Sequence, residues 1–338
     1  MNAITRDTLL DTAQAFKRSS LLKAAIELKL FDTLAAGPLD AAKVAAALGA
    51  GPRGIRILLG GLASIGLLDS DGVRFSLPEG ADRFLVTTSD EYSGAVVDIA
   101  TSAWEWDNLR DLAGVIRDGS TRGKPNTETP GFGYWRDFAG QTTFITHASA
   151  KTMTQALTPW ADGRERLRLL DVGCGHALFG LLFAQAFGQA EVSALDWENV
   201  LPFAREQADR LGLADRLTCL PGDAFTVPLN GPYDLVVLAN LLLMFSPERS
   251  TRLLRRVADV LEPGGRIAIA GFTVSEVLPE TERPAHLLSL TMLAGTTGGE
   301  THSVESYQRM LQATGFSPAS VHRVANLPFH VLVAEKPR

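Results

Sequence analysis

The amino-acid sequence predicts an α/β protein in which a doubly wound parallel sheet follows a mostly helical domain. From residue 166 onward, apolar runs of strand length alternate with helical segments, as in doubly wound sheets. Residues 1–95 have helical periodicity and a single hairpin signal. The chain of 338 residues is long enough for more than one domain, and its 46% hydrophobic content excludes a disordered or collagen-like protein.

Residues 1–95 are expected to form a winged-helix-like domain. The expected elements, in chain order, are helices over 19–34, 39–49 and 52–68 and a hairpin with its turn at Asp71 and Gly72. A DNA-binding regulator is disfavoured, because the third helix offers only Arg53 and Arg56 as basic residues. The apolar helices are instead expected to pack against a second copy, which predicts a homodimer.

Residues 96–160 are expected to form a helical connector that contributes to the substrate pocket. This segment is rich in aromatic residues and has a turn-rich break over 123–134. Trp135, Phe144 and Met153 are its candidate substrate-binding residues. Two interpretations stay open, since such side chains either line a pocket for a planar substrate or join the two domains.

Residues 161–338 carry the predicted sheet. Its strands are expected over 166–172, 190–196, 216–224, 233–240 and 266–272, followed by 320–324 and 328–336. Helices are expected between them over 178–188, 200–212, 249–261 and 304–316. The final strand is expected to be antiparallel, because two strands follow the last helix with a short connection.

Charge and cysteine content narrow the classes of function. Lys and Arg total 32 and Asp and Glu total 38, a net charge of −6, so neither nucleic acid nor an anionic membrane is an expected partner. Cys174 and Cys219 are too few for a disulfide framework and indicate a reducing compartment. No stretch resembles a signal peptide or a membrane span, so a cytoplasmic protein is expected. The six histidines have no metal-ligand spacing, so no metal site is expected.

Three consecutive strand ends carry residues suited to a nucleoside. Gly173 and Gly175 follow the first strand in LLDVGCGHALFG, where glycines let a ligand approach the backbone. Asp196 ends the second strand about twenty residues later, where a carboxylate accepts hydrogen bonds from ribose hydroxyls. The third strand ends in GDAF, placed to meet an adenine. The sequence therefore predicts a nucleoside site at this edge of the sheet.

These motifs, together with VADVLEPGGRIAIAGF and GGETHSVESYQRMLQATGF, resemble those of class I S-adenosylmethionine-dependent methyltransferases. With the winged-helix N-terminus, the chain is similar to the small-molecule O-methyltransferases that include plant caffeate-type and bacterial antibiotic-tailoring enzymes. The resemblance implies a Rossmann-like seven-stranded catalytic domain, S-adenosylmethionine as cofactor and a small, aromatic, secondary-metabolite-type substrate. It also implies these cofactor-binding residues: Asp171, Gly173, Gly175, Asp196, Trp197, Asp223, Ala224, Phe225 and Asn240.

The chain departs from this family where the catalytic base is expected. Members that methylate a hydroxyl carry a histidine after the fourth strand, whereas Leu243 and Met244 occupy that stretch here and neither accepts a proton. The assisting acid is displaced too, because Glu300 lies one position early and Thr301 stands at the expected site. Leu243 and Met244, with Met292, are predicted to line the substrate pocket, and packing in the apolar core stays an equal alternative for them.

Three outcomes are compatible with the missing base. An acceptor that is already deprotonated or has a free lone pair needs no base. The resemblance favours oxygen as the acceptor atom, whereas the missing histidine keeps nitrogen and carbon open. Alternatively, His147 or His302 supplies the base. The third outcome is a non-methylating enzyme, catalysing hydroxylation, decarboxylation or a pericyclic reaction, that uses the sulfonium as an electrostatic element.

Overall fold

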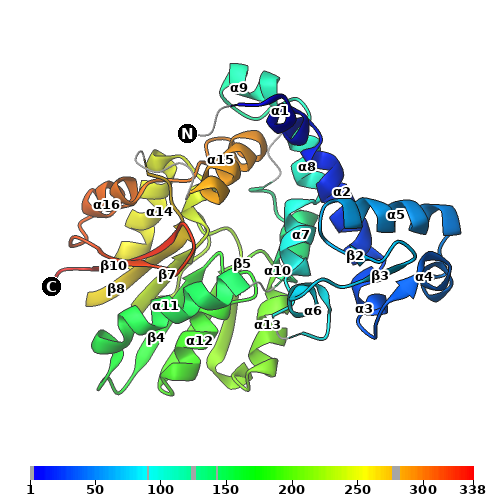
Figure 1. Ribbon diagram of the computed structural model, residues 1–338. Helices are drawn as coiled ribbons and strands as arrows, with labels where there is room; N and C mark the ends of the chain where they lie inside the picture. The colour runs from blue at the N-terminus through cyan, green and yellow to red at the C-terminus, as the bar shows by residue number, and fades with distance from the viewer. Residues whose placement is uncertain (1–3, 90, 123–126, 142–143, 276–281) are drawn as a thin grey trace. The chain divides into compact units, whose positions relative to one another are not determined.

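The computed structural model describes residues 4–89, 91–122, 127–141, 144–275 and 282–338. The chain divides into two compact units, Met1–Ala103 and Trp104–Arg338, coloured from blue to cyan and from cyan to red in Figure 1. Within the described ranges, no helix is long and apolar enough to cross a membrane. The first four residues of the turn-rich segment 123–134 lie outside the described residues.

The first unit combines helices with a small antiparallel sheet, as the winged-helix pattern predicts. Its helices are α1 (Arg6–Ala13), α2 (Ala15–Glu27), α3 (Leu30–Leu34), α4 (Ala41–Leu48), α5 (Pro52–Ser64), α6 (Ala81–Leu85) and α7 (Gly94–Ala100). Its strands β1 (Leu39–Asp40), β2 (Asp69–Ser70) and β3 (Arg74–Ser76) pair in the order β1-β3-β2. Asp40 caps α4 by accepting a hydrogen bond from the Lys43 amide at 2.9 Å.

The predicted helix over 19–34 is interrupted. Lys29 has a φ of 54°, in the left-handed region, and separates α2 from α3. The turn allows Leu30, Phe31 and Leu34 to be buried together in the core of this unit. Helical periodicity extends across the break, so the sequence pattern alone did not reveal it.

The second unit is built on a seven-stranded sheet in the order β6-β5-β4-β7-β8-β10-β9. The strands are β4 (Leu167–Val172), β5 (Ala190–Asp196), β6 (Leu217–Pro221), β7 (Tyr233–Ala239), β8 (Leu261–Phe272), β9 (Ser320–Arg323) and β10 (Phe329–Glu335). The five strands from β4 to β8 are parallel, and β10 is antiparallel to both β8 and β9. The predicted fold class and the antiparallel final strand are therefore confirmed.

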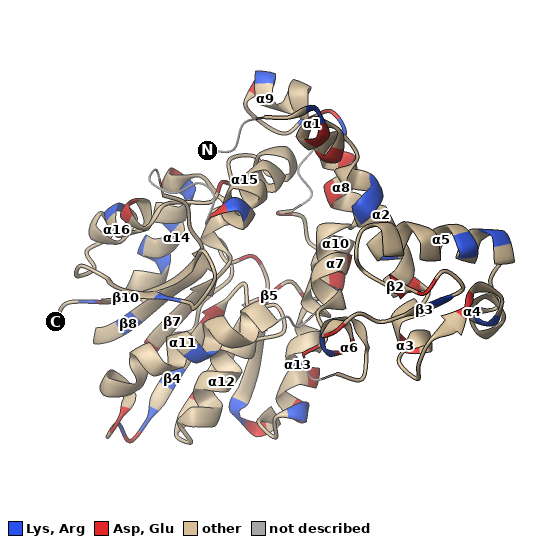
Figure 2. Cartoon of the chain, in the orientation of Figure 1, with Lys and Arg blue, Asp and Glu red and all other residues tan. Residues whose placement is uncertain are grey.

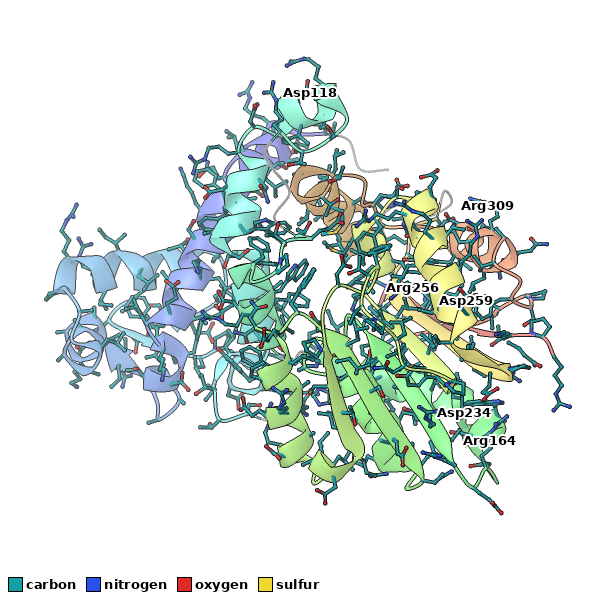
Figure 3. The ribbon with its side chains drawn as sticks, turned by 180° about the vertical axis from the view of Figure 1, so that it is seen from behind. Asp118, Arg164, Asp234, Arg256, Asp259 and Arg309 are labelled. Carbon is teal, nitrogen blue, oxygen red and sulfur yellow. The ribbon has the colours of Figure 1, made fainter. Side chains whose placement is uncertain are left out.

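Two apolar cores cover the two faces of this sheet. Alternate residues of a strand enter different cores, as Leu169 and Leu170 do in β4. The first core includes α11 and α12, and the second includes α14 and α16, which Figure 3 shows from behind. The helices of this unit are α8 (Ala103–Leu109), α9 (Leu112–Asp118), α10 (Gly133–Ala139), α11 (Phe144–Ala161), α12 (Leu178–Ala186), α13 (Leu201–Arg210), α14 (Pro247–Asp259), α15 (Arg283–Gly295) and α16 (Val304–Gln312). Two short 3-10 helices are η1 (Ala214–Arg216) and η2 (Leu242–Met244).

Both signs of charge occur in each unit, as Figure 2 shows. Helix α14 combines Arg249, Arg252, Arg255 and Arg256 with Glu248 and Asp259. At the amino ends of β4 and β7, Arg164 approaches Asp234 at 3.7 Å, and both are labelled in Figure 3.

Candidate functional site

The loop between β4 and α12 has a backbone conformation that depends on its glycines. Gly173 and Gly175 have φ values of 65° and 56°, in the left-handed region. The Gly173 amide donates to the Leu195 carbonyl of β5 at 2.8 Å, which fixes the loop against the neighbouring strand. A Cβ at Gly173 would lie 2.9 Å from the Leu241 side chain, whereas no heavy atom lies within 4 Å of a Cβ position at Gly175. The backbone at Gly175 is thus open to a ligand.

Asp171 supports this loop from below. Its carboxylate is 1% exposed and accepts a hydrogen bond from the Gly180 amide in the first turns of α12 at 3.1 Å. Burial raises the pKa of Asp171 to about 7, and the Gly180 hydrogen bond opposes that rise. Asp171 therefore joins β4 to α12 and holds the loop between them in place.

Asp196 lies at the end of β5, beside the open backbone of Gly175. Its two carboxylate oxygens accept hydrogen bonds from the amides of Gly175 at 2.8 Å and Trp197 at 2.7 Å. Burial raises the pKa of Asp196 to about 6 against the effect of both hydrogen bonds. A carboxylate has about four acceptor positions, so capacity remains for the two hydroxyls of a ribose.

The segment from Gly222 to Phe225 follows β6 and folds back toward Asp196. The Gly222 amide donates to the Asp196 carbonyl at 3.0 Å, and Asp223 Oδ1 accepts from the Phe225 amide at 2.8 Å. Arg256 of α14 donates from Nε to the Ala224 carbonyl at 2.9 Å. These contacts fix Ala224 and Phe225 next to the carboxylate of the adjacent strand.

Asn240 follows β7 and has a buried acceptor without a partner. Its φ is 51°, and its backbone N–H donates to the Ala270 carbonyl of β8 at 2.7 Å. Asn240 Oδ1 is buried and makes no hydrogen bond. A buried acceptor of this kind is costly unless a ligand supplies the donor. An orphaned amide oxygen, an open glycine backbone and a carboxylate with spare acceptor capacity fit a nucleoside joined to an amino acid, as in S-adenosylmethionine.

We call residues 171–177, 196–197, 222–225 and Asn240 the cofactor edge. It contains every cofactor-binding residue predicted from the sequence, and the strand ends bring those residues side by side. Because the carboxyl ends of parallel strands meet at one edge of the sheet, this proximity follows from topology. Their role as ligands remains a prediction.

A second set of residues, which we call the acceptor wall, consists of residues 242–245, Met292 and residues 299–302. Leu243 and Met244 lie in η2 and are 4% and 7% exposed, and Met292 of α15 is 4% exposed in the same apolar core. A Cβ at Gly299 would lie 2.6 Å from the Leu243 carbonyl oxygen, so the two parts of the wall are in close contact. Leu243, at the position where the resemblance implies a histidine, is thus a packed apolar residue.

His302 belongs to the acceptor wall, but its ring is engaged with the backbone. It is 2% exposed, its Nε2 lies 3.1 Å from the Phe245 carbonyl oxygen, and its Nδ1 lies 3.7 Å from Glu300. Burial lowers the pKa of His302 and the Glu300 charge opposes this. A neutral ring donates its Nε2 proton to Phe245, which leaves Nδ1 as the remaining acceptor.

The other catalytic candidate, His147, lies on α11 and is exposed. Burial is the largest cause that lowers the pKa of His176 to about 4, and electrostatic interactions with His147 and Arg210 contribute to the shift, so the two histidines lie near each other. His176 Nδ1 accepts a hydrogen bond from the Leu178 amide at 3.3 Å within the glycine loop. His147 therefore borders the cofactor edge.

The predicted substrate residues of the connector are in three different environments. Trp135 is partly buried against the core that holds the acceptor wall, and its Nε1 donates to the Thr127 carbonyl at 2.7 Å. Phe144 is 50% exposed at the first residue of α11. Met153 is fully buried in the other core, on the opposite face of the sheet. Of the three, Trp135 alone packs against the core of the acceptor wall.

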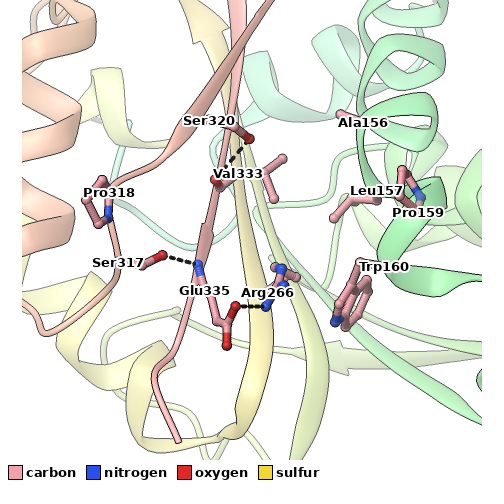
Figure 4. Close-up of a pocket in the computed structure, with 10 residues that line it drawn as sticks. All are labelled: Ala156, Leu157, Pro159, Trp160, Arg266, Ser317, Pro318, Ser320, Val333 and Glu335. Atoms are coloured by element: carbon pink, nitrogen blue, oxygen red, sulfur yellow. Dashed lines mark hydrogen bonds and ion pairs between the residues drawn. The ribbon is translucent and has the colours of Figure 1, made fainter.

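Two cavities among the described residues of the second unit bear on the site. A cavity of about 410 Å³ adjoins the acceptor wall and is lined by Glu128, Met244, Phe245, Ser246, Arg249, Thr297 and Gly298. A cavity of about 290 Å³, drawn in Figure 4, lies beside Trp160 of α11 and Arg266 of β8. In this second cavity Arg266 is paired with Glu335 at 2.9 Å and the Ser317 hydroxyl accepts from the Glu335 amide at 2.9 Å, so polar groups there are already engaged. The first cavity is the better candidate for function.

The sequence analysis did not identify Glu128 and Arg249. They form an ion pair across 121 positions, and neither belongs to a motif. Pairs so distant in the chain leave no signal in a single sequence, so only the folded structure reveals them.

Comparisons with known proteins agree with this geometry. Residues 10–87 match the O-methyltransferase dimerisation domain, and residues 141–317 match the O-methyltransferase domain. Acetylserotonin O-methyltransferase of Mus musculus is 30% identical, with 97% of this chain and 88% of that protein covered. L-tyrosine C(3)-methyltransferase of Streptomyces lavendulae is 30% identical over 93% of this chain and 88% of that protein. A solved structure of a proposed O-methyltransferase of Nostoc punctiforme is 28% identical, with a TM-score of 0.90 over 99% of this chain and 100% of that one.

Proposed function

The chain belongs to the O-methyltransferase family, and from that premise we propose that it methylates a small aromatic acceptor of secondary-metabolite type. It is an S-adenosylmethionine-dependent methyltransferase. The observation that carries the proposal is the Asp196 carboxylate, held by the amides of Gly175 and Trp197 beside an open glycine backbone.

The cofactor edge is proposed to bind and orient S-adenosylmethionine. Asp196 would accept from the ribose hydroxyls, Asp223 with Ala224 and Phe225 would meet the adenine, and Asn240 Oδ1 would accept from the amino-acid part. Gly173, Gly175 and Trp197 provide the backbone around the nucleoside, and Asp171 holds the loop. When bound, the cofactor would supply a methyl group on a sulfonium: the nucleophilic atom of the acceptor would attack the methyl carbon in line, the bond between sulfur and methyl would break, and S-adenosylhomocysteine would leave.

The acceptor wall is proposed to orient the acceptor without removing its proton through residue 243. Leu243 and Met244 are packed and apolar, so they exclude water and shape the site. An acidic phenol that is ionised in solution, a heteroaromatic nitrogen or an enolisable carbon fits such a wall. Oxygen is favoured by the family, and the L-tyrosine C(3)-methyltransferase relative is a precedent for a carbon acceptor.

The functional unit is proposed to be a homodimer formed through the first unit of the chain. Residues 10–87 match a dimerisation domain. Apolar side chains on α1 and α2 support this assignment, because Leu9, Leu10 and Phe16 are 60%, 51% and 63% exposed. Large apolar side chains that are exposed in a single chain are commonly buried in an interface with a second chain.

The experiment is a transfer assay with methyl-labelled S-adenosylmethionine and a panel of hydroxylated, amino and enolisable aromatic molecules. Labelled product and S-adenosylhomocysteine, released in equal amounts and resolved by mass spectrometry, would support the proposal. Fragmentation would place the methyl group on oxygen, nitrogen or carbon. Acceptor turnover without S-adenosylhomocysteine release would instead support non-methylating chemistry and overturn the proposal.

A further inference from the structure

Arg249 of α14 contacts two aromatic rings at the border between the cofactor edge and the acceptor wall. Its guanidinium carbon lies 4.2 Å from the centre of the Phe225 ring and 5.4 Å from that of Phe245. The two rings meet edge to face with centres 5.0 Å apart and planes at 86°. A cation over both rings favours this arrangement through cation–π attraction.

Glu128 holds the guanidinium in this place. One edge of the Arg249 fork pairs with the Glu128 carboxylate, while Arg249 Nε is buried without a hydrogen-bond partner. The two side chains are 34% and 30% exposed, a degree at which an ion pair contributes little to stability. Its effect is therefore geometric, because a planar guanidinium fixed at one edge keeps its face toward the rings.

The backbone that carries Glu128 is itself anchored. Trp135 Nε1 donates to the Thr127 carbonyl at 2.7 Å, next to Glu128 in the chain. Farther along, the Phe132 carbonyl accepts from Asn199 Nδ2 at 3.5 Å, three residues beyond Asp196. The segment 127–132 is thus joined to α14 at one end and to the loop after β5 at the other.

We propose that Arg249 is a positioning residue for the adenine of the cofactor, and that Glu128 fixes Arg249 in turn. Arg249 holds the Phe225 and Phe245 rings in the orientation in which Phe225 meets the adenine. This inference rests on the proposed function, because Phe225 contacts an adenine only if the cofactor edge binds S-adenosylmethionine.

The test is calorimetric binding of S-adenosylhomocysteine and of 5′-methylthioadenosine to the purified full chain. Arg249→Met should weaken both ligands by about the same factor, about tenfold, because both contain the adenine. Arg249→Lys keeps the ion pair but loses the flat face, so its loss should fall between wild type and Arg249→Met. Glu128→Gln should weaken both ligands by about threefold. Arg252→Met, at an exposed position of the same helix, is the matched control and should bind as wild type does.

Steady-state kinetics add a second readout. For Arg249→Met, KM for S-adenosylmethionine should rise with the binding loss while kcat stays within twofold. Wild-type affinity in Arg249→Met would overturn the inference and leave the proposed function standing. Failure of wild type to bind S-adenosylhomocysteine would overturn the proposed function itself. If Arg249→Met does not fold, Glu128→Gln and Arg249→Lys decide, and unchanged affinity in both would overturn the inference.

Discussion

The cofactor edge and the acceptor wall both include residues that follow β7, but the two are built from different chemistry. At the cofactor edge, backbone amides and carboxylates make the contacts, as the Gly175 amide and Asp196 do at 2.8 Å. At the acceptor wall, packed apolar side chains such as Leu243 and Met292 dominate. A site made of backbone groups requires particular residues at particular spacings, whereas a wall of side chains tolerates many sequences of similar volume. The first kind of site therefore constrains residue identity more strongly than the second.

Replacement of Asp196 tests the cofactor edge and is expected to have the largest effect on ligand binding. Asp196→Ala removes the acceptor for the ribose hydroxyls and leaves the Gly175 and Trp197 amides unpaired, so affinity for S-adenosylhomocysteine should fall by at least about 100-fold. Calorimetry would measure this loss. Glu191→Ala, at an exposed position in the same strand, is the control and should bind normally. Retained affinity in Asp196→Ala would remove Asp196 from the cofactor edge.

Replacement of Asp171 separates support of the loop from contact with a ligand. Folding raises the pKa of Asp171 to about 7, so the unfolded chain binds fewer protons between about pH 4 and pH 7. The free energy of unfolding should therefore fall as the pH rises through that window. Asp171→Asn keeps an acceptor for Gly180 without the buried charge, and should be more stable than wild type by on the order of 2 kcal/mol at pH 8.

Urea unfolding at pH 5 and pH 8 checks this expectation. The stability gap between Asp171→Asn and wild type should be smaller at pH 5, in the lower part of that window, than at pH 8, above the folded-state pKa. A gap that is the same at both values would mean that Asp171 does not titrate with a raised pKa. Burial also raises the pKa of Asp196 to about 6, so comparing the two variants at equal pH avoids assigning its effect to Asp171.

Replacement of His302 tests whether the acceptor wall only orients the acceptor or also removes a proton from it. His302→Ala should lower the free energy of unfolding by about 1 to 2 kcal/mol, because it leaves a cavity and an unpaired Phe245 carbonyl. With an acceptor that is ionised in solution, kcat should stay within about threefold. Thermal unfolding and steady-state kinetics measure the two effects. A loss of about 100-fold in kcat, with a pH profile shifted from wild type, would identify His302 as the base.

His147 is expected to have the smallest effect. It is exposed on α11, so His147→Ala should change kcat by less than about twofold and leave stability nearly unchanged. Because His147 lies near His176, the substitution should also raise the pKa of His176 slightly, which titration by NMR would detect. A loss of about 100-fold in kcat would transfer the role of base to His147.

Fold class and the cofactor edge were predictable from the sequence for a common reason. Strand and helix periodicity gave the order of elements, and the glycines and carboxylates at strand ends needed no knowledge of distant contacts. The boundaries of helices and strands were less predictable, because a residue between two elements fits the periodicity of either one. Leu261, predicted to end a helix, begins β8 instead, where it pairs with Tyr233 of β7.

Environments within the fold were not predictable in the same way. Met153 was a pocket candidate by residue type and is fully buried in the core beside α12. His302 is held by a backbone carbonyl 57 positions away, and Arg249 is held by Glu128 at 121 positions. Each of these contacts joins elements that meet only when the sheet and its helices pack.

The sequence by itself therefore predicted the doubly wound sheet and the residues at three strand ends that are suited to binding a nucleoside. It also showed that position 243 holds a leucine and not a histidine. These features depend on local periodicity and on residue identity at fixed spacing. Only the tertiary structure showed that the Leu243 side chain is buried and that Asn240 Oδ1 has no hydrogen-bond partner. It also showed that Glu128 pairs with Arg249, whose guanidinium lies over the Phe225 ring. The physical reason is that burial, hydrogen-bond satisfaction and ring contacts depend on residues brought together from distant parts of the chain.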